Sequence, residues 1–219
     1  MGKNYATIRR KVIKWFGTNG RDFPWRNTTD PYRVLIAEIL LRRTTATAVC
    51  RVFAEFIDRF DSIERLARAR EVTIERALSS LGLQSRRAHE LKKMASFIYK
   101  KYSGTIPMNH ADLLALPGVG DYIASAVSNF AFGEPVQLVD GNVIHFVSRV
   151  FGISFKGPTD SKAWEFMKDF GGKQQEAKLY WGIIDLVATI CLRKNPRCSI
   201  CPLSEVCLYS KGAPSVEST

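Results

Sequence analysis

Apolar residues recur at three- and four-residue spacing along most of this chain, and that periodicity restricts it to a helical fold. Short breaks containing glycine or proline separate the periodic segments. Strand signals amount to one short extended piece at residues 136–139. The sequence therefore predicts an all-α protein, with helices over residues 5–17, 32–43, 46–60, 86–102, 122–132, 143–151, 161–170 and 177–191.

The chain carries a large positive charge. Its 219 residues include 32 Lys and Arg against 21 Asp and Glu, a formal net charge of +11, and basic pairs such as Arg42-Arg43 and Arg86-Arg87 occur along its length. This excess favours a polyanionic partner, either nucleic acid or an anionic membrane surface. No apolar run reaches the roughly 18–20 residues that span a bilayer. We therefore expect a cytosolic protein with nucleic acid as its partner and no membrane partner.

Four of the five cysteines lie together near the C-terminus: Cys191, Cys198, Cys201 and Cys207, with the spacing C-x6-C-x2-C-x5-C. A disulfide frame is not expected, because the cytosol keeps thiols reduced. Four thiolates this close could hold Zn²⁺ or a [4Fe–4S] cluster. Zinc sites usually show two close cysteine pairs, and this segment has one, so the spacing favours the cluster. Cys50 stands apart and is expected to be a buried thiol.

Two further segments carry polar or glycine-rich signals. LPGVG at 116–120 predicts a tight turn between helices, in which Gly118 and Gly120 permit positive φ and leave backbone amides free to approach phosphate. A turn without any ligand has the same pattern. Asp140 precedes a predicted helix, where a lone acid most often serves as the N-cap.

Together, LPGVG at 116–120, VDGNV at 139–143 and the ordered cysteines resemble the helix-hairpin-helix DNA glycosylase superfamily with an iron–sulfur loop. The resemblance implies two helical lobes, residues 25–135 with the hairpin and residues 1–24 plus 136–219 with the cluster loop. It also implies that Asp140 is the carboxylate that stabilises positive charge on the sugar while the N-glycosidic bond breaks.

Two other residues acquire catalytic roles from this resemblance. Tyr122 stands where enzymes resembling endonuclease III carry a Schiff-base lysine, which implies a monofunctional hydrolytic glycosylase; the alternative is a core aromatic. Glu38 lies among apolar helical neighbours, where burial should raise its pKa and suit it to protonate the leaving base. The alternative for Glu38 is a buried ion pair with Arg42.

The residues after Glu38 indicate which base is removed. Segments 21–26 and 30–32 fit adenine- and thymine-specific mismatch glycosylases alike, but Arg42 and Arg43 stand where adenine enzymes usually have two glutamines. The chain also stops soon after Cys207, before the domain with which adenine enzymes recognise 8-oxoguanine. The resemblance thus implies removal of thymine or uracil opposite guanine, in base excision repair. The alternatives are an adenine glycosylase acting on A·G or A·8-oxoG mispairs and a non-catalytic DNA-binding module.

The expected partner is double-stranded DNA containing a mismatch, bound by a monomer associated with the nucleoid. His145 replaces an arginine common in the family, which leaves phosphate contacts at that position open. The DNA-binding residues that the resemblance implies are Arg43, Leu83, Gln84, Gly118, Gly120 and Asn142.

Overall fold

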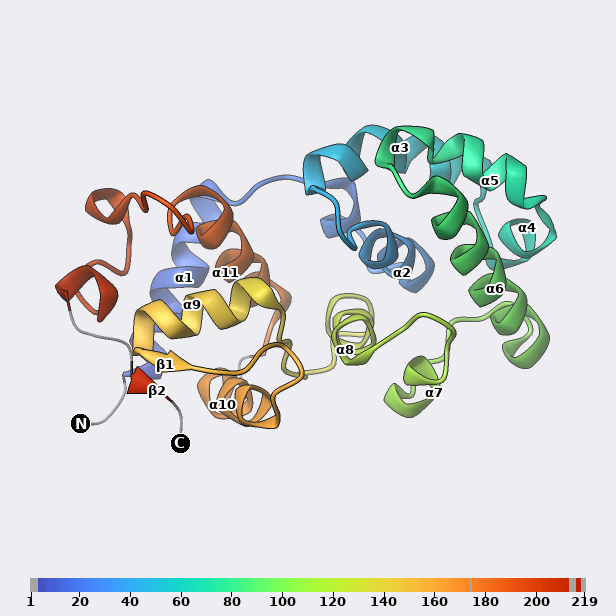
Figure 1. Ribbon diagram of the computed structural model, residues 1–219. Helices are drawn as coiled ribbons and strands as arrows, with labels where there is room; N and C mark the ends of the chain where they lie inside the picture. Colours follow the sequence, from blue (N-terminus) through green and yellow to red (C-terminus); the bar gives the residue numbers. More distant parts are fainter. Residues whose placement is uncertain (1–3, 174, 213–215, 218–219) are drawn as a thin grey trace. The chain divides into compact units, whose positions relative to one another are not determined.

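A computed structural model describes residues 4–173, 175–212 and 216–217 of the chain (Figure 1). The all-α prediction is confirmed: across these residues the structure has eleven α-helices, four short 3-10 turns and two strands of two residues each. The chain divides into two compact units, one formed by residues 22–132 and the other by residues 1–21 together with 133–219.

The unit of residues 22–132 is a helical array in which α6 packs against α4 and α5, while α2 contacts α3 and α8 (Figure 1). Helix α2 begins where its sequence predicts, because Asp30 accepts a hydrogen bond from the Tyr32 amide and Pro31 occupies the first helical position. The elements of this unit are η1 (Pro24–Arg26), α2 (Pro31–Leu40), α3 (Ala46–Arg59), α4 (Ile63–Arg68), α5 (Glu71–Ala77), η2 (Ser79–Leu81), α6 (Gln84–Tyr102), α7 (His110–Leu114) and α8 (Asp121–Phe130).

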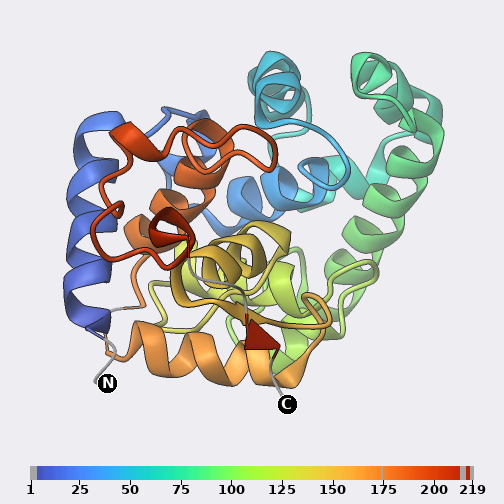
Figure 2. The same ribbon diagram turned by 60° about the vertical axis from the view of Figure 1, so that its left-hand side comes forward.

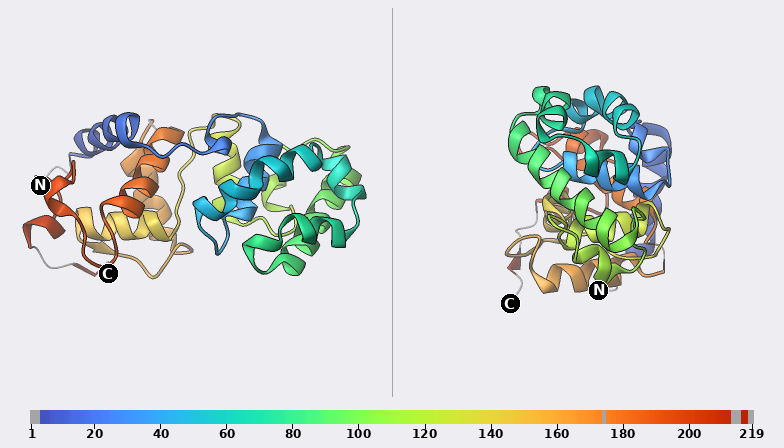
Figure 3. Two further views of the ribbon diagram at one scale, coloured as in Figure 1. Left: turned by 90° about the horizontal axis from the view of Figure 1, so that it is seen from above. Right: turned by 90° about the vertical axis from the view of Figure 1, so that its right-hand side faces the viewer.

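The other unit is assembled from both ends of the chain, and its helix α11 packs against α1 and α9 (Figures 2 and 3). Gly182 allows the close approach of α1, since a Cβ atom there would lie 2.7 Å from Cγ1 of Val12. The elements of this unit are α1 (Tyr5–Asn19), α9 (Gly141–Phe151), β1 (Ile153–Ser154), α10 (Ser161–Gly171), α11 (Ala177–Thr189), η3 (Cys198–Ile200), η4 (Tyr209–Lys211) and β2 (Val216–Glu217), with β1 and β2 parallel.

The structure differs from the sequence prediction in its short elements. Helices α4, α5 and α7 were not predicted, because each is shorter than the window of about 11 residues in which periodicity becomes visible. Helix α2 ends at Leu40 rather than residue 43, and residues 133–140 form neither helix nor strand. In the described part of the chain, every helix is too short or too polar to cross a membrane.

Candidate functional site

The turn between α7 and α8 brings two glycines to the N-terminus of α8. Gly118 has φ +81°, a conformation that strongly favours glycine. Gly120 differs from the prediction: as the N-cap of α8 it has φ −109° and ψ −178°, which is extended backbone open to any residue. A Cβ atom at Gly120 would meet nothing within 4 Å, so its contribution is uncovered backbone at the start of a helix. The predicted helix-hairpin-helix is thus present, with only one glycine required by backbone conformation.

Asp140 is the N-cap of α9, as its position before a helix predicts. Its Oδ1 atom accepts hydrogen bonds from the backbone amides of Asn142 at 2.9 Å and Val143 at 2.8 Å. Its Oδ2 atom accepts a further bond of 2.8 Å from the side-chain amide of Asn142. The structure therefore brings Asp140 and Asn142 into direct contact and fixes the plane of the carboxylate.

The environment of Asp140 acts on its pKa in opposite directions. Burial raises the pKa, because the ionised form loses hydration. The hydrogen bonds from Val143 and Asn142, and then the charge of Arg193, lower it. The net result is a raised pKa. A carboxylate that is poorly hydrated but held by donors is a strong electrostatic partner for a developing cation.

Glu38 and Tyr122 belong to the unit of residues 22–132. Glu38 is only 5% exposed on α2, so its prediction as a buried acid among apolar neighbours is borne out in burial. Tyr122 is the second residue of α8 and is half-buried. Since α2 packs against α8, both residues stand on neighbouring helices.

Two exposed residues of this unit adopt backbone conformations that L-residues rarely adopt. Arg43, after the end of α2, has φ +54°, and Leu83, the N-cap of α6, has φ +53°. Leu83 is also 56% exposed. Gln84 follows as the first residue of α6. Backbone strain at residues other than glycine clusters at functional sites, where the surrounding structure maintains it.

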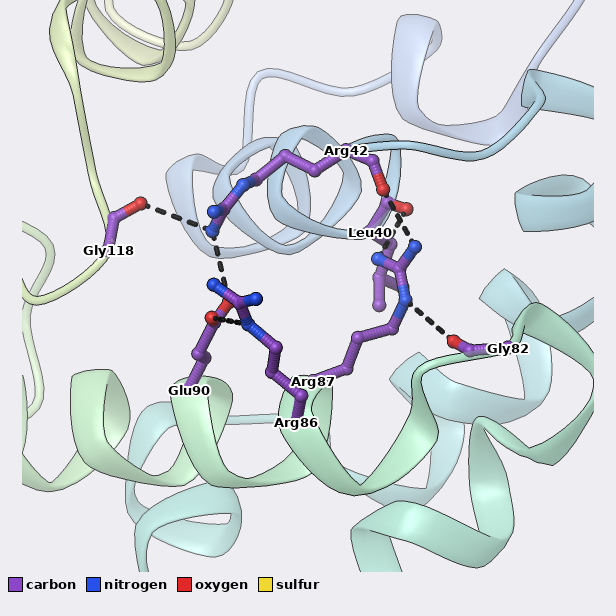
Figure 4. A network of polar contacts seen from close by, with 7 residues as sticks. All are labelled: Leu40, Arg42, Gly82, Arg86, Arg87, Glu90 and Gly118. Atoms are coloured by element: carbon purple, nitrogen blue, oxygen red, sulfur yellow. Dashed lines mark hydrogen bonds and ion pairs between the residues drawn. The ribbon is translucent and has the colours of Figure 1, made fainter.

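Arg87, which forms a basic pair with Arg86 in the sequence, is buried with 6% exposure. Its guanidinium donates to the carbonyl groups of Leu40, Arg42 and Gly82 (Figure 4). The sequence does contain a signal for this burial, because Arg87 precedes Leu91 by four residues on the apolar face of α6.

The cysteine segment folds back onto α9. The Leu208 amide donates to the Val150 carbonyl at 3.1 Å, and the Cys207 thiol to the Arg149 carbonyl at 3.3 Å. Arg149 donates to the carbonyl groups of Leu192 and Arg193 at 2.8 Å and 3.0 Å, and to Sγ of Cys191 at 3.8 Å. Arg149 thus holds the start of the segment, a role that its sequence position did not reveal.

The four thiols of this segment are close enough to influence one another. Burial raises the pKa of Cys191 and of Cys201, and the neighbouring thiols of the set raise both further. All four are free thiols. Among the described residues, no three Cys, His, Asp or Glu side chains converge on the position of a single metal ion.

His145 lies beside the same segment. Its Nε2 atom is 2.9 Å from the Cys191 carbonyl and 3.8 Å from Cys191 Sγ. Burial lowers its pKa, and the carbonyl contact opposes this shift. His145 therefore contacts the start of the cysteine segment.

Comparison with known proteins agrees with this arrangement. Residues 36–170 match the HhH-GPD superfamily of base excision DNA repair proteins, and residues 191–207 match the iron–sulfur binding domain of endonuclease III. The second match begins and ends on Cys191 and Cys207, and it confirms the predicted iron–sulfur cofactor.

Individual relatives are similar along nearly their whole length. The thymine-DNA glycosylase of Aeropyrum pernix is 41% identical over 208 residues, covering 92% of this chain and 93% of the relative. The thymine/uracil-DNA glycosylase of Pyrobaculum aerophilum is 39% identical over 215 residues, covering 95% and 94%. The solved structure of a thermostable thymine-DNA glycosylase superimposes with a TM-score of 0.90 at 33% identity, over 95% of this chain and 97% of that one. The chain belongs to the HhH-GPD superfamily of base excision DNA repair proteins.

Proposed function

We propose that this protein is a monofunctional DNA glycosylase that hydrolyses the N-glycosidic bond of thymine or uracil mispaired with guanine. The observation that carries the choice of base is the 41% and 39% identity, over more than nine-tenths of each relative, to enzymes named for thymine and uracil. Arg42 and Arg43, in place of the two glutamines usual in adenine enzymes, support the same choice.

Asp140 is proposed as the carboxylate that faces the deoxyribose. Breaking the N-glycosidic bond places positive charge on the sugar, and an ionised carboxylate beside the anomeric carbon stabilises that charge. Three hydrogen bonds from Asn142 and Val143 hold the group in one orientation before substrate binds, so little reorganisation is needed during the reaction. Asn142 is proposed to orient this carboxylate.

Glu38 and Tyr122 are proposed to act on the base and its pocket. Glu38, a carboxyl group with 5% exposure on an apolar helix, is proposed to donate a proton to the departing base. Tyr122 carries no amine, so it cannot form a Schiff base with the sugar. Hydrolysis without strand cleavage follows from that difference.

Cys191, Cys198, Cys201 and Cys207 are proposed as the four ligands of the [4Fe–4S] cluster. The cluster supplies a cross-link among these thiolates and needs no redox role, since base hydrolysis transfers no electrons. Arg149 and His145 support the first ligand through its carbonyl neighbours and its sulfur. The basic residues between the ligands, Arg193, Lys194 and Arg197, add positive charge for DNA phosphates.

The proposed partner is double-stranded DNA with a mismatch, bound by a monomer associated with the nucleoid. The backbone amides at the start of α8, near Gly118 and Gly120, are suited to bind phosphate without reading sequence. The target nucleotide must leave the base stack, which costs less for a mismatch than for a Watson–Crick pair. Arg43, Leu83 and Gln84 are proposed to fill the vacated space.

A panel of duplexes tests this proposal. The protein is incubated with G·T, G·U, A·G, A·8-oxoG and fully paired duplexes, and abasic sites are then cleaved with alkali. We expect product from G·T and G·U and no strand cleavage before the alkali step. Product from the adenine mispairs alone would identify an adenine glycosylase. No product from any duplex, with binding retained, would identify a non-catalytic DNA-binding module.

A further inference from the structure

We propose that Arg87 is a positioning residue that holds the two loops carrying Arg43 and Leu83 in the conformation that enters DNA. This inference rests on the proposed function, because it concerns how that function's DNA-inserting side chains are presented. The observation behind it is one buried guanidinium shared between two loops that are far apart in the sequence (Figure 4).

The guanidinium contacts the two loops at equivalent points. Nη2 donates to the Arg42 carbonyl at 2.7 Å, and Nε donates to the Gly82 carbonyl at 3.1 Å. Each carbonyl belongs to the peptide group directly before a residue with left-handed backbone, Arg43 in one loop and Leu83 in the other. Arg87 therefore fixes the orientation of the two peptide groups that precede Arg43 and Leu83, the residues with positive φ.

A third hydrogen bond ties the guanidinium to the scaffold. Nη1 donates to the Leu40 carbonyl at 3.0 Å, at the last residue of α2. The backbone amide of Arg87 also donates to the Leu83 carbonyl at 2.9 Å. The Arg87 guanidinium, which lies between α2 and α6, thus binds both loops at once.

Only arginine supplies this set of donors. Three nitrogens of one planar group reach three carbonyls in different directions, whereas a lysine ammonium is a single point. The position is also electrostatically unfavourable, because burial and then the nearby charge of Arg42 lower the pKa of Arg87. A basic residue serving only to attract DNA would be more effective at the exposed surface.

The same network extends to the hairpin. Arg42 donates from Nη1 to Glu90 at 3.1 Å and to the Gly118 carbonyl at 3.5 Å. The Arg42 carbonyl accepts a hydrogen bond from Arg87, and the Arg42 side chain contacts Glu90 of α6 and Gly118. Arg42 therefore joins the Arg43 loop to both α6 and the turn before α8 (Figure 4). Arg42 makes the contact with the hairpin, whereas Arg87 directly holds the carbonyl groups before Arg43 and Leu83. Loss of Arg87 is expected to disturb the inserting side chains more than the phosphate contacts for that reason.

The test compares Arg87→Met and Arg87→Lys with the matched control Arg86→Gln. Arg86 is the adjacent residue on α6, its side chain is 67% exposed, and it pairs with Glu90 on the same helix. Each holoenzyme is measured for its affinity for an undamaged duplex, its single-turnover excision from a G·T duplex, and the fluorescence of 2-aminopurine placed beside the target thymine. The fluorescence reports unstacking and needs no base excision.

We expect Arg87→Met to lower the single-turnover rate about 100-fold and to abolish the fluorescence rise, while duplex affinity stays within about threefold of Arg86→Gln. Arg87→Lys should give an intermediate rate and fluorescence, and it carries the test if Arg87→Met fails to fold. Wild-type rate and fluorescence in Arg87→Lys and Arg87→Met would overturn the proposal. So would loss of affinity and rate in equal proportion with an unchanged fluorescence rise, since that is the behaviour of a phosphate contact.

Failure of the proposed function has a different signature. A wild-type protein that gives the fluorescence rise but excises no base would contradict the glycosylase assignment and leave the loop proposal standing on the fluorescence of the Arg87 variants.

Discussion

Asn142 donates its side-chain amide to Oδ2 of Asp140 at 2.8 Å while its backbone amide donates to Oδ1 at 2.9 Å, so one residue grips both oxygens of the carboxylate. A carboxylate offers about four acceptor positions. With the Val143 amide also bound to Oδ1, three of these positions are used by donors of α9. The remaining capacity is available for a sugar or a water molecule.

Replacing Asn142 by alanine should make excision more sensitive to acid. The side-chain hydrogen bond from Asn142 lowers the pKa of Asp140, and its loss leaves the effect of burial less opposed, so the pKa rises further. Because the proposed mechanism needs the ionised form, the acid limb of the rate profile moves to higher pH. Single-turnover rates from about pH 4 to 8 check this. A limb that moves to lower pH would contradict the assignment.

Asp140→Asn should lose activity and gain stability. Without the carboxylate, excision should fall by about 10³-fold or more, while duplex binding is retained. The raised pKa means that the folded state binds this proton more tightly than the unfolded chain, so stability is lost as pH rises above the unfolded pKa near 3.8. Ionised Asp140 therefore destabilises the protein at pH 7, and asparagine removes that cost while still capping α9.

Melting temperatures of Asp140→Asn and the wild type, measured at a series of pH values from about 7 down to about 4, test this effect. The variant should melt higher at pH 7, and the difference should shrink as the pH falls toward the unfolded pKa of Asp140. An unchanged or lower melting temperature at pH 7 would show that ionised Asp140 carries no such cost.

Tyr122→Lys should introduce strand cleavage. The amine at the second residue of α8 would attack C1′ of the deoxyribose as the base leaves with the electron pair of the N-glycosidic bond. Opening of the sugar ring then gives a Schiff base, and elimination of the 3′ phosphate from it breaks the strand. Incubation with a G·U duplex, borohydride trapping and a gel without alkali detect the covalent complex and the nick. Tyr122→Phe is the matched control and should give neither. The absence of both from the lysine variant would remove Tyr122 from the proposed pocket.

Cys201→Ser should release the cluster, because a serine hydroxyl is a poor iron ligand. The absorbance near about 400 nm should disappear, and DNA affinity should fall because the basic residues between the ligands lose their arrangement. Cys50→Ser is the control, since Cys50 lies on α3 and outside the cysteine segment. Retained absorbance in Cys201→Ser, or its loss in Cys50→Ser, would contradict the proposed ligand set.

Most of the helices could be predicted from local sequence signals. The features that could not be predicted depend on contacts between residues far apart in the sequence. The long helices were predictable because their apolar spacing repeats over many residues, and Asp140 was predictable as a cap. In helices α4 and α7 the N-cap residue is the only local sequence signal. Ser62 accepts a hydrogen bond from the Arg65 amide, and Asn109 accepts hydrogen bonds from the amides of Ala111 and Asp112. Short caps of this kind also occur in turns, so they do not identify a helix alone.

The environment of Arg87 lay outside the reach of sequence reasoning for a different reason. Its acceptors are backbone carbonyls, which every residue has, at positions as distant as Leu40 and Gly82. The left-handed backbone of Arg43 and Leu83 was equally unpredictable, because neither residue type favours it. The catalytic and DNA-binding roles of the predicted site residues stay predictions until their variants are measured.

The division of the chain into one continuous unit and one built from both ends has a consequence for synthesis on the ribosome. Residues 22–132 form one compact unit from a continuous stretch of chain, so they can pack while translation continues. Helix α1 is made before α11, the helix against which Gly182 lets it pack closely. Until α11 is made, the buried side of α1, with Ile8 and Val12, lacks the helix that covers it in the folded unit.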